Sequence, residues 1–185
     1  MSFGSYLHRN YLNIATVLLV LIAVGRLGVS PELPAVVAFI VGGVLLAAID
    51  WRVQRLPRRI VYLTLAGVAG GLVFAAIVER AWTPLLTAVA GALLFGNAFM
   101  LIWLVSTHVF GMRMIGLGDV RLAVVIGLLL GWWGLPAVLY GALVGHAFAL
   151  LIAVVTSVRA GRLQPRYSFG PPLIAGALAV VLVAS

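Results

Sequence analysis

Long apolar runs separated by short basic segments dominate the chain. The main stretches without a charged residue are 10–25, 33–49, 60–78, 81–112, 122–158 and 167–185. A helix needs roughly 20 apolar residues to cross a bilayer, with a range of about 17–25, so most of these runs approach or exceed spanning length. The 122–158 run is too long for one span, and Trp132-Trp133-Gly134-Leu135-Pro136 divides it. No run alternates polar and apolar residues as a membrane β-barrel requires.

The pattern predicts an all-α, polytopic membrane protein with about seven transmembrane helices. We expect them near 11–28, 35–50, 60–78, 84–106, 119–132, 136–158 and 170–184. The first is the weakest, because it is short and contains Asn13, and Arg9 before an apolar stretch is also typical of a signal peptide. We expect it to be retained, since no small-x-small cleavage site follows. The predicted organisation is an N-terminal helix with an outer loop (1–34) and a six-helix membrane core (35–185).

Glycines spaced four residues apart occur in three of the predicted helices. Such pairs let helix backbones approach closely in lipid, although glycine is also simply common in membrane helices. The pairs are Gly67 with Gly71, Gly127 with Gly131, and Gly141 with Gly145.

Composition agrees with a membrane protein and argues against several kinds of site. The chain is 64% hydrophobic and 9% charged, against about 45–50% and about 25% in soluble domains. It contains no cysteine, so it has no disulfide, no cysteine zinc site and no thiol nucleophile. Its three histidines follow no H-E-x-x-H pattern. We therefore expect neither a metal nor an organic cofactor.

The arginines predict the orientation of the helices. A net charge of +8 could indicate nucleic-acid binding, but the arginines lie in short connections between apolar runs, so we expect the lipid bilayer and not nucleic acid as the partner. Arginine-rich short loops are usually cytoplasmic. This places the N-terminus inside and the C-terminus outside. The loops expected inside carry Arg52, Arg55, Arg58, Arg59, Arg113, Arg159, Arg162 and Arg166.

The chain has only two aspartates, and the predicted topology places both on the cytoplasmic face. Asp50 ends the second predicted helix and Asp119 begins the fifth. An acid at the edge of a span usually faces a polar cavity or a partner. Each aspartate could instead pair with Arg52 or Arg121, and Asp119 could cap its own helix. Position alone does not decide between these interpretations.

Three short motifs surround the aspartates and the last helix. Gly116-Leu117-Gly118-Asp119-Val120-Arg121 reads G-x-G-D-x-R, Pro57 follows Asp50 by seven positions, and Tyr167-Ser168-Phe169-Gly170-Pro171-Pro172 precedes the last apolar run. In this order the motifs resemble the prepilin peptidases, also called type IV leader peptidases, which are intramembrane aspartic proteases of the GxGD class. The resemblance covers roughly residues 35–184.

The resemblance implies that Asp50 and Asp119 are a catalytic dyad. Two carboxyl groups about 3 Å apart cannot both ionise easily, so they share a proton. The ionised member takes a proton from water, and the protonated member donates to the scissile carbonyl; the sequence does not distinguish the two. The implied substrate is a prepilin-like membrane protein of a prokaryote, cut at the cytoplasmic face of the cell membrane. The supporting residues in the motifs are Gly116, Gly118, Arg121, Pro57, Gly170 and Pro171.

Three features depart from the family pattern. Arg121 stands where lysine is common, and Arg58-Arg59 follows Pro57 where Asn or Asp is common. Longer members also contain a cytoplasmic, cysteine-containing region linked to N-methylation of the product. This chain has no cysteine, and its longest expected cytoplasmic loop is about ten residues. We therefore expect a short form with peptidase activity alone.

Other interpretations stay open at this point. Arg55 could meet an acidic residue of the substrate, but we favour a role in orientation and contact with anionic lipid. Ser106 and Ser168 lack the G-x-S-x-G context of a serine nucleophile. His146, within a predicted helix, is expected to be neutral and hydrogen-bonded. For the whole protein, the alternatives are a small transporter with the aspartates as ion or proton sites and a non-catalytic assembly subunit.

Overall fold

Seven helices account for nearly all of the described chain. The computed structural model describes residues 3–109, 111, 115–160 and 168–184. No strand occurs among these residues, so the predicted all-α class is confirmed. The helices are α1 (Phe3–Leu27), α2 (Leu33–Val53), α3 (Arg58–Glu79), α4 (Trp82–His108), α5 (Leu117–Gly131), α6 (Leu135–Ala160) and α7 (Gly170–Ala184).

Five of these helices are long and apolar enough to cross a membrane, namely α1, α2, α3, α4 and α6. The other two, α5 and α7, have 15 residues each. At 1.5 Å per residue each extends for about 22 Å, which is less than the roughly 30 Å of a bilayer's hydrocarbon core. The prediction of a polytopic helical membrane protein is therefore confirmed, with two inner helices shorter than a full span.

The helix limits agree closely with the sequence prediction for α7 and differ most for α1 and α2. Helix α1 begins at Phe3, eight residues earlier than expected, and α2 continues three residues past Asp50 to Val53. Polar residues can extend a helix beyond its apolar run, and hydropathy does not detect this. As a consequence, Asp50 lies within the last turn of α2 and not at its end.

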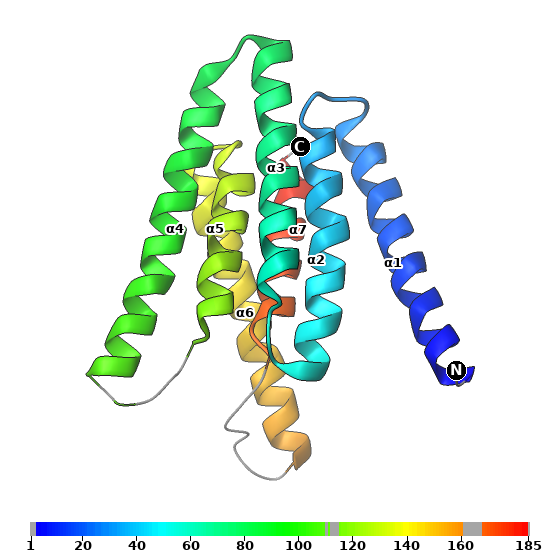
Figure 1. Ribbon diagram of the computed structural model, residues 1–185, viewed down its shortest axis with the longest axis vertical. Helices are drawn as coiled ribbons and strands as arrows, with labels where there is room; N and C mark the ends of the chain where they lie inside the picture. Colours follow the sequence, from blue (N-terminus) through cyan, green and yellow to red (C-terminus); the bar gives the residue numbers. More distant parts are fainter. Residues whose placement is uncertain (1–2, 110, 112–114, 161–167, 185) are drawn as a thin grey trace.

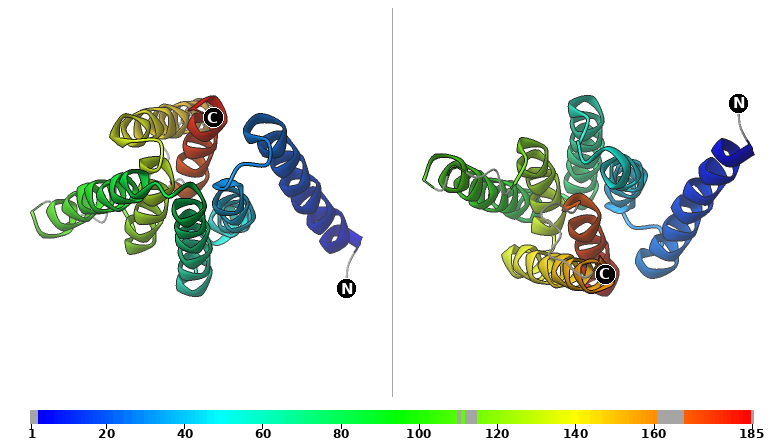
Figure 2. Two further views of the ribbon diagram at one scale, coloured as in Figure 1. Left: turned by 90° about the horizontal axis from the view of Figure 1, so that it is seen from above. Right: turned by 90° about the horizontal axis from the view of Figure 1, so that it is seen from below.

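The two short helices lie in the interior of the bundle. Helix α5 packs most extensively on α4 and also contacts α2, α3, α6 and α7, while α7 contacts α1, α2, α5 and α6. Most of residues 120–131 in α5 are buried. Figures 1 and 2 show α1 leaning away at the edge of the bundle, with the other longer helices grouped around α5 and α7. The best-packed elements are thus the ones that carry Asp119 and Gly170.

All three predicted glycine pairs lie at contacts between helices. A Cβ on Gly71 would lie 2.5 Å from the backbone nitrogen of Ala35, and one on Gly131 would lie 2.6 Å from the carbonyl oxygen of Thr87. Gly127 is equally close to the backbone of α4, and Gly141 and Gly145 both face the side chains of neighbouring helices. The close backbone approach that such spacing favours is therefore present.

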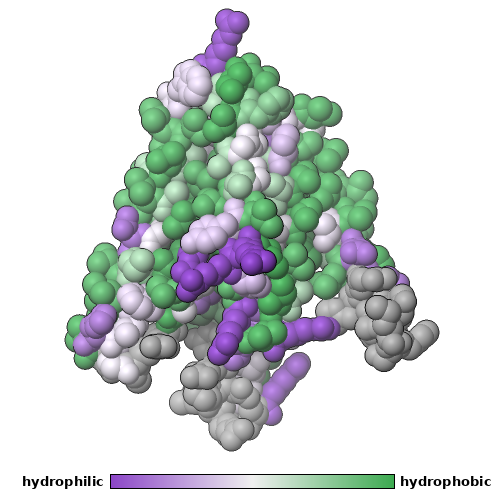
Figure 3. Space-filling model, viewed as in Figure 1, coloured by the Kyte–Doolittle hydropathy of each residue, from purple (hydrophilic) through white to green (hydrophobic). Residues whose placement is uncertain are grey.

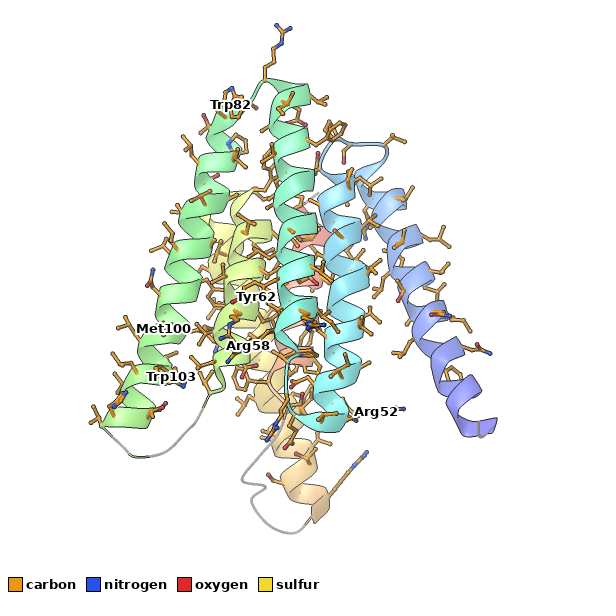
Figure 4. All side chains as sticks on the ribbon, viewed as in Figure 1. Arg52, Arg58, Tyr62, Trp82, Met100 and Trp103 are labelled. Carbon is orange, nitrogen blue, oxygen red and sulfur yellow. The ribbon has the colours of Figure 1, made fainter. Side chains whose placement is uncertain are left out.

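Hydrophilic residues gather at one end of the molecule. Figure 3 shows a surface that is largely apolar, with most hydrophilic residues toward its lower end. In Figure 4, Arg52 and Arg58 lie toward that end, where α2 ends and α3 begins, and Trp82 lies at the opposite end. Of the residues used in the sequence analysis, Arg113, Arg162, Arg166 and Tyr167 lie outside the described residues, as do the side chains of the first nine residues.

Candidate active site

Asp50 is held in the last turn of α2 and is almost completely buried. Asp50 is 5% exposed to solvent. The helix ends because Gln54 adopts a left-handed conformation with φ of 51°, and the backbone N–H of Gln54 donates to the carbonyl oxygen of Asp50 over 2.9 Å. A buried carboxyl needs hydrogen-bond donors nearby, since leaving such a group unpaired is costly.

Those donors come from the start of α7. The Gly170 N–H donates to Asp50 Oδ2 over 3.1 Å, and the Ser168 hydroxyl donates to the same oxygen. A Cβ on residue 170 would lie 2.8 Å from Oδ2, so the backbone can approach this closely only at glycine. The described partners of the Asp50 carboxyl are thus the Ser168 hydroxyl and the Gly170 N–H. The pairing with Arg52 that the sequence allowed is not among the described contacts.

Asp119 is the third residue of α5 and caps that helix. Its Oδ2 accepts a 3.1 Å hydrogen bond from the N–H of Gly116, the residue immediately before the helix. Carboxylates are favoured here because the first N–H groups of a helix lack intrahelical partners. The capping interaction predicted as one alternative is therefore present, and it fixes the carboxyl at the N-terminal end of α5.

The fold brings the two aspartates into one neighbourhood. Helices α2 and α5 contact each other, and Gly118, the neighbour of Asp119, packs on Leu56 in the connection after α2. Asp119 is half-buried while Asp50 is buried, so one of the two acids is more accessible than the other. Two acids can share a proton and act in turn as base and acid where their carboxyl groups lie close together.

The connection between α2 and α3 packs against the start of α5. A Cβ on Gly118 would lie 2.9 Å from Leu56 Cβ, and Pro57, which follows Leu56, is the residue immediately before α3. Gly118 therefore meets the residue immediately before Pro57, where the two motifs come together. The absence of a side chain at position 118 allows the α2–α3 connection to lie directly on the G-x-G-D turn.

Three other residues were predicted to support the site, namely Pro171, Arg121 and Arg55. Pro171 occupies the first turn of α7, where proline is well tolerated. Arg121 is half-buried on α5, and Arg55 is exposed. Within the described part of the chain, no hydrogen bond links either arginine to Asp50 or Asp119.

Sequence reasoning did not find the contact between Ser168 and Asp50. Ser168 was named there within the last motif and as a candidate nucleophile, and nothing in the sequence indicated that its hydroxyl would reach α2. Phe169 packs edge-on against the His146 ring, with ring centroids 5.6 Å apart. His146 Nδ1 lies 2.7 Å from the carbonyl oxygen of Ala142, which agrees with the prediction of a hydrogen-bonded histidine.

No group of three or more His, Asp or Glu side chains that could hold a metal ion occurs among the residues that the structure describes.

Comparison with known proteins adds an independent finding. Residues 37–158 match the model of the type IV leader peptidase family. A prepilin leader peptidase/N-methyltransferase of Dickeya chrysanthemi is 36% identical over 141 residues, which are 75% of this chain and 47% of that protein. The chain thus spans about half the length of this curated relative. No solved structure matches this chain. The matched region includes Asp50 and Asp119 but ends before the turn that contains Ser168 and Gly170.

Proposed function

Because the chain belongs to the type IV leader peptidase family, we propose that it is an aspartic endopeptidase that removes the N-terminal leader of prepilin-like membrane proteins. Asp50 and Asp119 are the catalytic pair. The observation that carries this proposal is that Gly118, the neighbour of Asp119, packs on Leu56 in the connection that follows the helix of Asp50, so the two motifs meet although they come from different helices. Family membership does not favour the transporter or assembly-subunit alternatives.

The pair would hydrolyse a peptide bond without a covalent intermediate. One carboxylate takes a proton from a water molecule, whose oxygen attacks the scissile carbonyl carbon. The other carboxyl donates its proton to the carbonyl oxygen and stabilises the charge that develops there. When the tetrahedral intermediate breaks down, the C–N bond is cleaved, the leaving amine receives a proton from the pair, and one hydroxyl of the intermediate returns its proton to the pair. One proton therefore remains shared between the two carboxyl groups at the end of the cycle.

The position of the pair in the bundle matches a substrate that enters from the bilayer. Asp50 is two residues from Arg52, which lies at the hydrophilic end of the molecule (Figure 4). The positive-inside tendency makes this end cytoplasmic in our proposal, with the N-terminus inside, the C-terminus outside and the protein in the cell membrane. A prepilin-like substrate would leave its apolar helix in lipid and present its polar leader junction to the carboxyl groups.

The test is cleavage by the purified protein in detergent. Prepilin-like proteins encoded in the same genome are incubated with it, and the N-terminus of each product is sequenced. We expect one cut between the polar leader and the apolar helix, with a product that carries no methyl group. Asp50→Asn and Asp119→Asn should each abolish cleavage, because an amide can neither take nor supply the shared proton.

Glu79→Gln is the matched control, since it makes the same acid-to-amide change at an exposed residue at the far end of α3. It should cleave like the wild type. All four proteins should insert into the membrane to the same extent, as measured by membrane fractionation. Substantial cleavage by either aspartate variant would refute the assignment of the pair, and failure of the wild type on every prepilin-like protein would refute the proposed substrate.

A further inference from the structure

One oxygen of Asp50 has two donors from the same short turn. The Ser168 hydroxyl and the Gly170 N–H both donate to Oδ2. Among the described residues, the side-chain hydrogen bonds of this carboxyl all reach Oδ2. The turn before α7 therefore contacts one edge of the Asp50 carboxyl through both donors.

Ser168 uses its hydroxyl in an unusual way for this chain. The hydroxyls of Thr64, Ser106 and Thr156 donate to carbonyl oxygens of their own helices, three or four residues earlier. The Ser168 hydroxyl instead reaches a side chain 118 positions away in the sequence. A hydroxyl that only needed to be satisfied could bond to a local carbonyl, as the other three do.

The residue between the two donors anchors the turn. Phe169 packs against the buried core, and its ring lies edge-on to that of His146 on α6. The His146 ring also contacts that of Phe99 on α4, with centroids 6.0 Å apart. Two longer helices thus hold the turn in place, and Ser168 and Gly170 on either side of Phe169 are fixed with it.

We propose that Ser168 is a positioning residue for the reaction: its hydroxyl, together with the Gly170 N–H, holds the Asp50 carboxyl by one oxygen and presents the other to the reacting atoms. This inference rests on the proposed function, because it assigns a role within the same pair of acids. Ser168 does not itself react. It keeps a buried carboxyl in a single orientation, which a reaction that needs two aligned acids requires.

The test separates positioning from substrate binding. In Ser168→Ala, kcat should fall by about ten- to a hundredfold, the range expected for losing a hydrogen bond to a charged group, and KM should stay unchanged. Ser168→Thr, which keeps a hydroxyl on the same carbon, should recover most of the lost kcat. Ser106→Ala is the matched control, since it removes a buried hydroxyl whose hydrogen bond, among the described residues, is to its own helix; it should leave both constants unchanged.

Three outcomes would overturn the inference. If Ser168→Ala keeps the wild-type kcat, the hydroxyl does not position the acid. If KM rises while kcat is unchanged, Ser168 contacts the substrate. If Ser168→Thr is as slow as Ser168→Ala and both melt at a lower temperature than the wild type, the serine has only a structural role.

A second measurement does not depend on cleavage. Dicyclohexylcarbodiimide modifies carboxyl groups within membranes, and mass spectrometry of the peptide containing Asp50 measures the extent. Labelling should be faster in Ser168→Ala than in the wild type, because the group that covers Oδ2 has gone. Equal labelling would contradict the contact. If the wild type fails on every substrate while labelling increases as expected, the proposed function is wrong and the contact between Ser168 and Asp50 stands.

Discussion

The backbone N–H of Gly170 donates a 3.1 Å hydrogen bond to the carboxyl of Asp50, 120 positions earlier in the chain. The bond joins the first residue of α7 to the last turn of α2. Most of the membrane core lies between them in sequence, so the surroundings of this acid are complete only after α7 has packed. The contact also depends on the lack of a side chain at residue 170.

Gly170→Ala should therefore impair cleavage severely. The added methyl group would lie 2.8 Å from Asp50 Oδ2, so either the carboxyl or the turn must move, and a displaced catalytic group costs roughly a hundredfold in rate. The measurement is kcat/KM on a prepilin-like substrate. Gly70→Ala is the control, because a Cβ there meets nothing within 4 Å. Equal activity of the two variants would show that the close approach at residue 170 is not needed.

Gly127→Ala should lower stability more than it lowers the intrinsic activity of the folded protein. A Cβ at this position would run into the backbone carbonyl of Gly91 on α4, and backbone cannot move aside as a flexible side chain can. Overpacking of this kind costs about 1–3 kcal/mol. Unfolding in detergent by a denaturing surfactant measures the loss. Gly25→Ala on α1, which has open space around it, should unfold like the wild type, and a similar midpoint for both variants would contradict the tight α4–α5 contact.

His146 should matter for its ring and not for its proton chemistry. His146→Phe keeps a ring beside Phe169 and should retain most of the activity. His146→Ala removes that support and should lower kcat by up to about tenfold, the range of an aromatic pair. The comparison is made at one pH with both variants matched for protein amount. A His146→Phe variant as inactive as an aspartate variant would instead assign the imidazole a direct part in the reaction.

The sequence predicts the location of the site better than its internal contacts. Arginine bias and two motifs placed Asp50 and Asp119 on the same face, and the structure brings the helices that carry them, α2 and α5, into contact. The hydrogen bond from Ser168 could not be predicted, because it depends on how α7 packs against α2. The sequence alone does not show how two helices so far apart along the chain pack together. The short length of α5 was predicted, because Trp132-Trp133-Gly134-Leu135-Pro136 divides the apolar run, and the helix ends at Gly131.

The orientation of the site can be tested with single cysteines, since the chain contains none of its own. Gln54 and Arg80 form a matched pair. Each is exposed, each follows the last residue of its helix, and each has a left-handed backbone, with φ of 51° and 52°. They lie at opposite ends of α3, so in a membrane protein they should lie on opposite sides of the bilayer.

In intact spheroplasts, a maleimide that cannot cross membranes should label Arg80→Cys and leave Gln54→Cys unlabelled. After permeabilisation both should react, which controls for the intrinsic reactivity of each cysteine. The expected direction follows from the arginines near Gln54, which favour the cytoplasmic side. Labelling of Gln54→Cys in intact spheroplasts would place Asp50, four residues earlier, near the outer face. Leader removal would then have to occur after translocation, and the cytoplasmic site that we propose would be wrong.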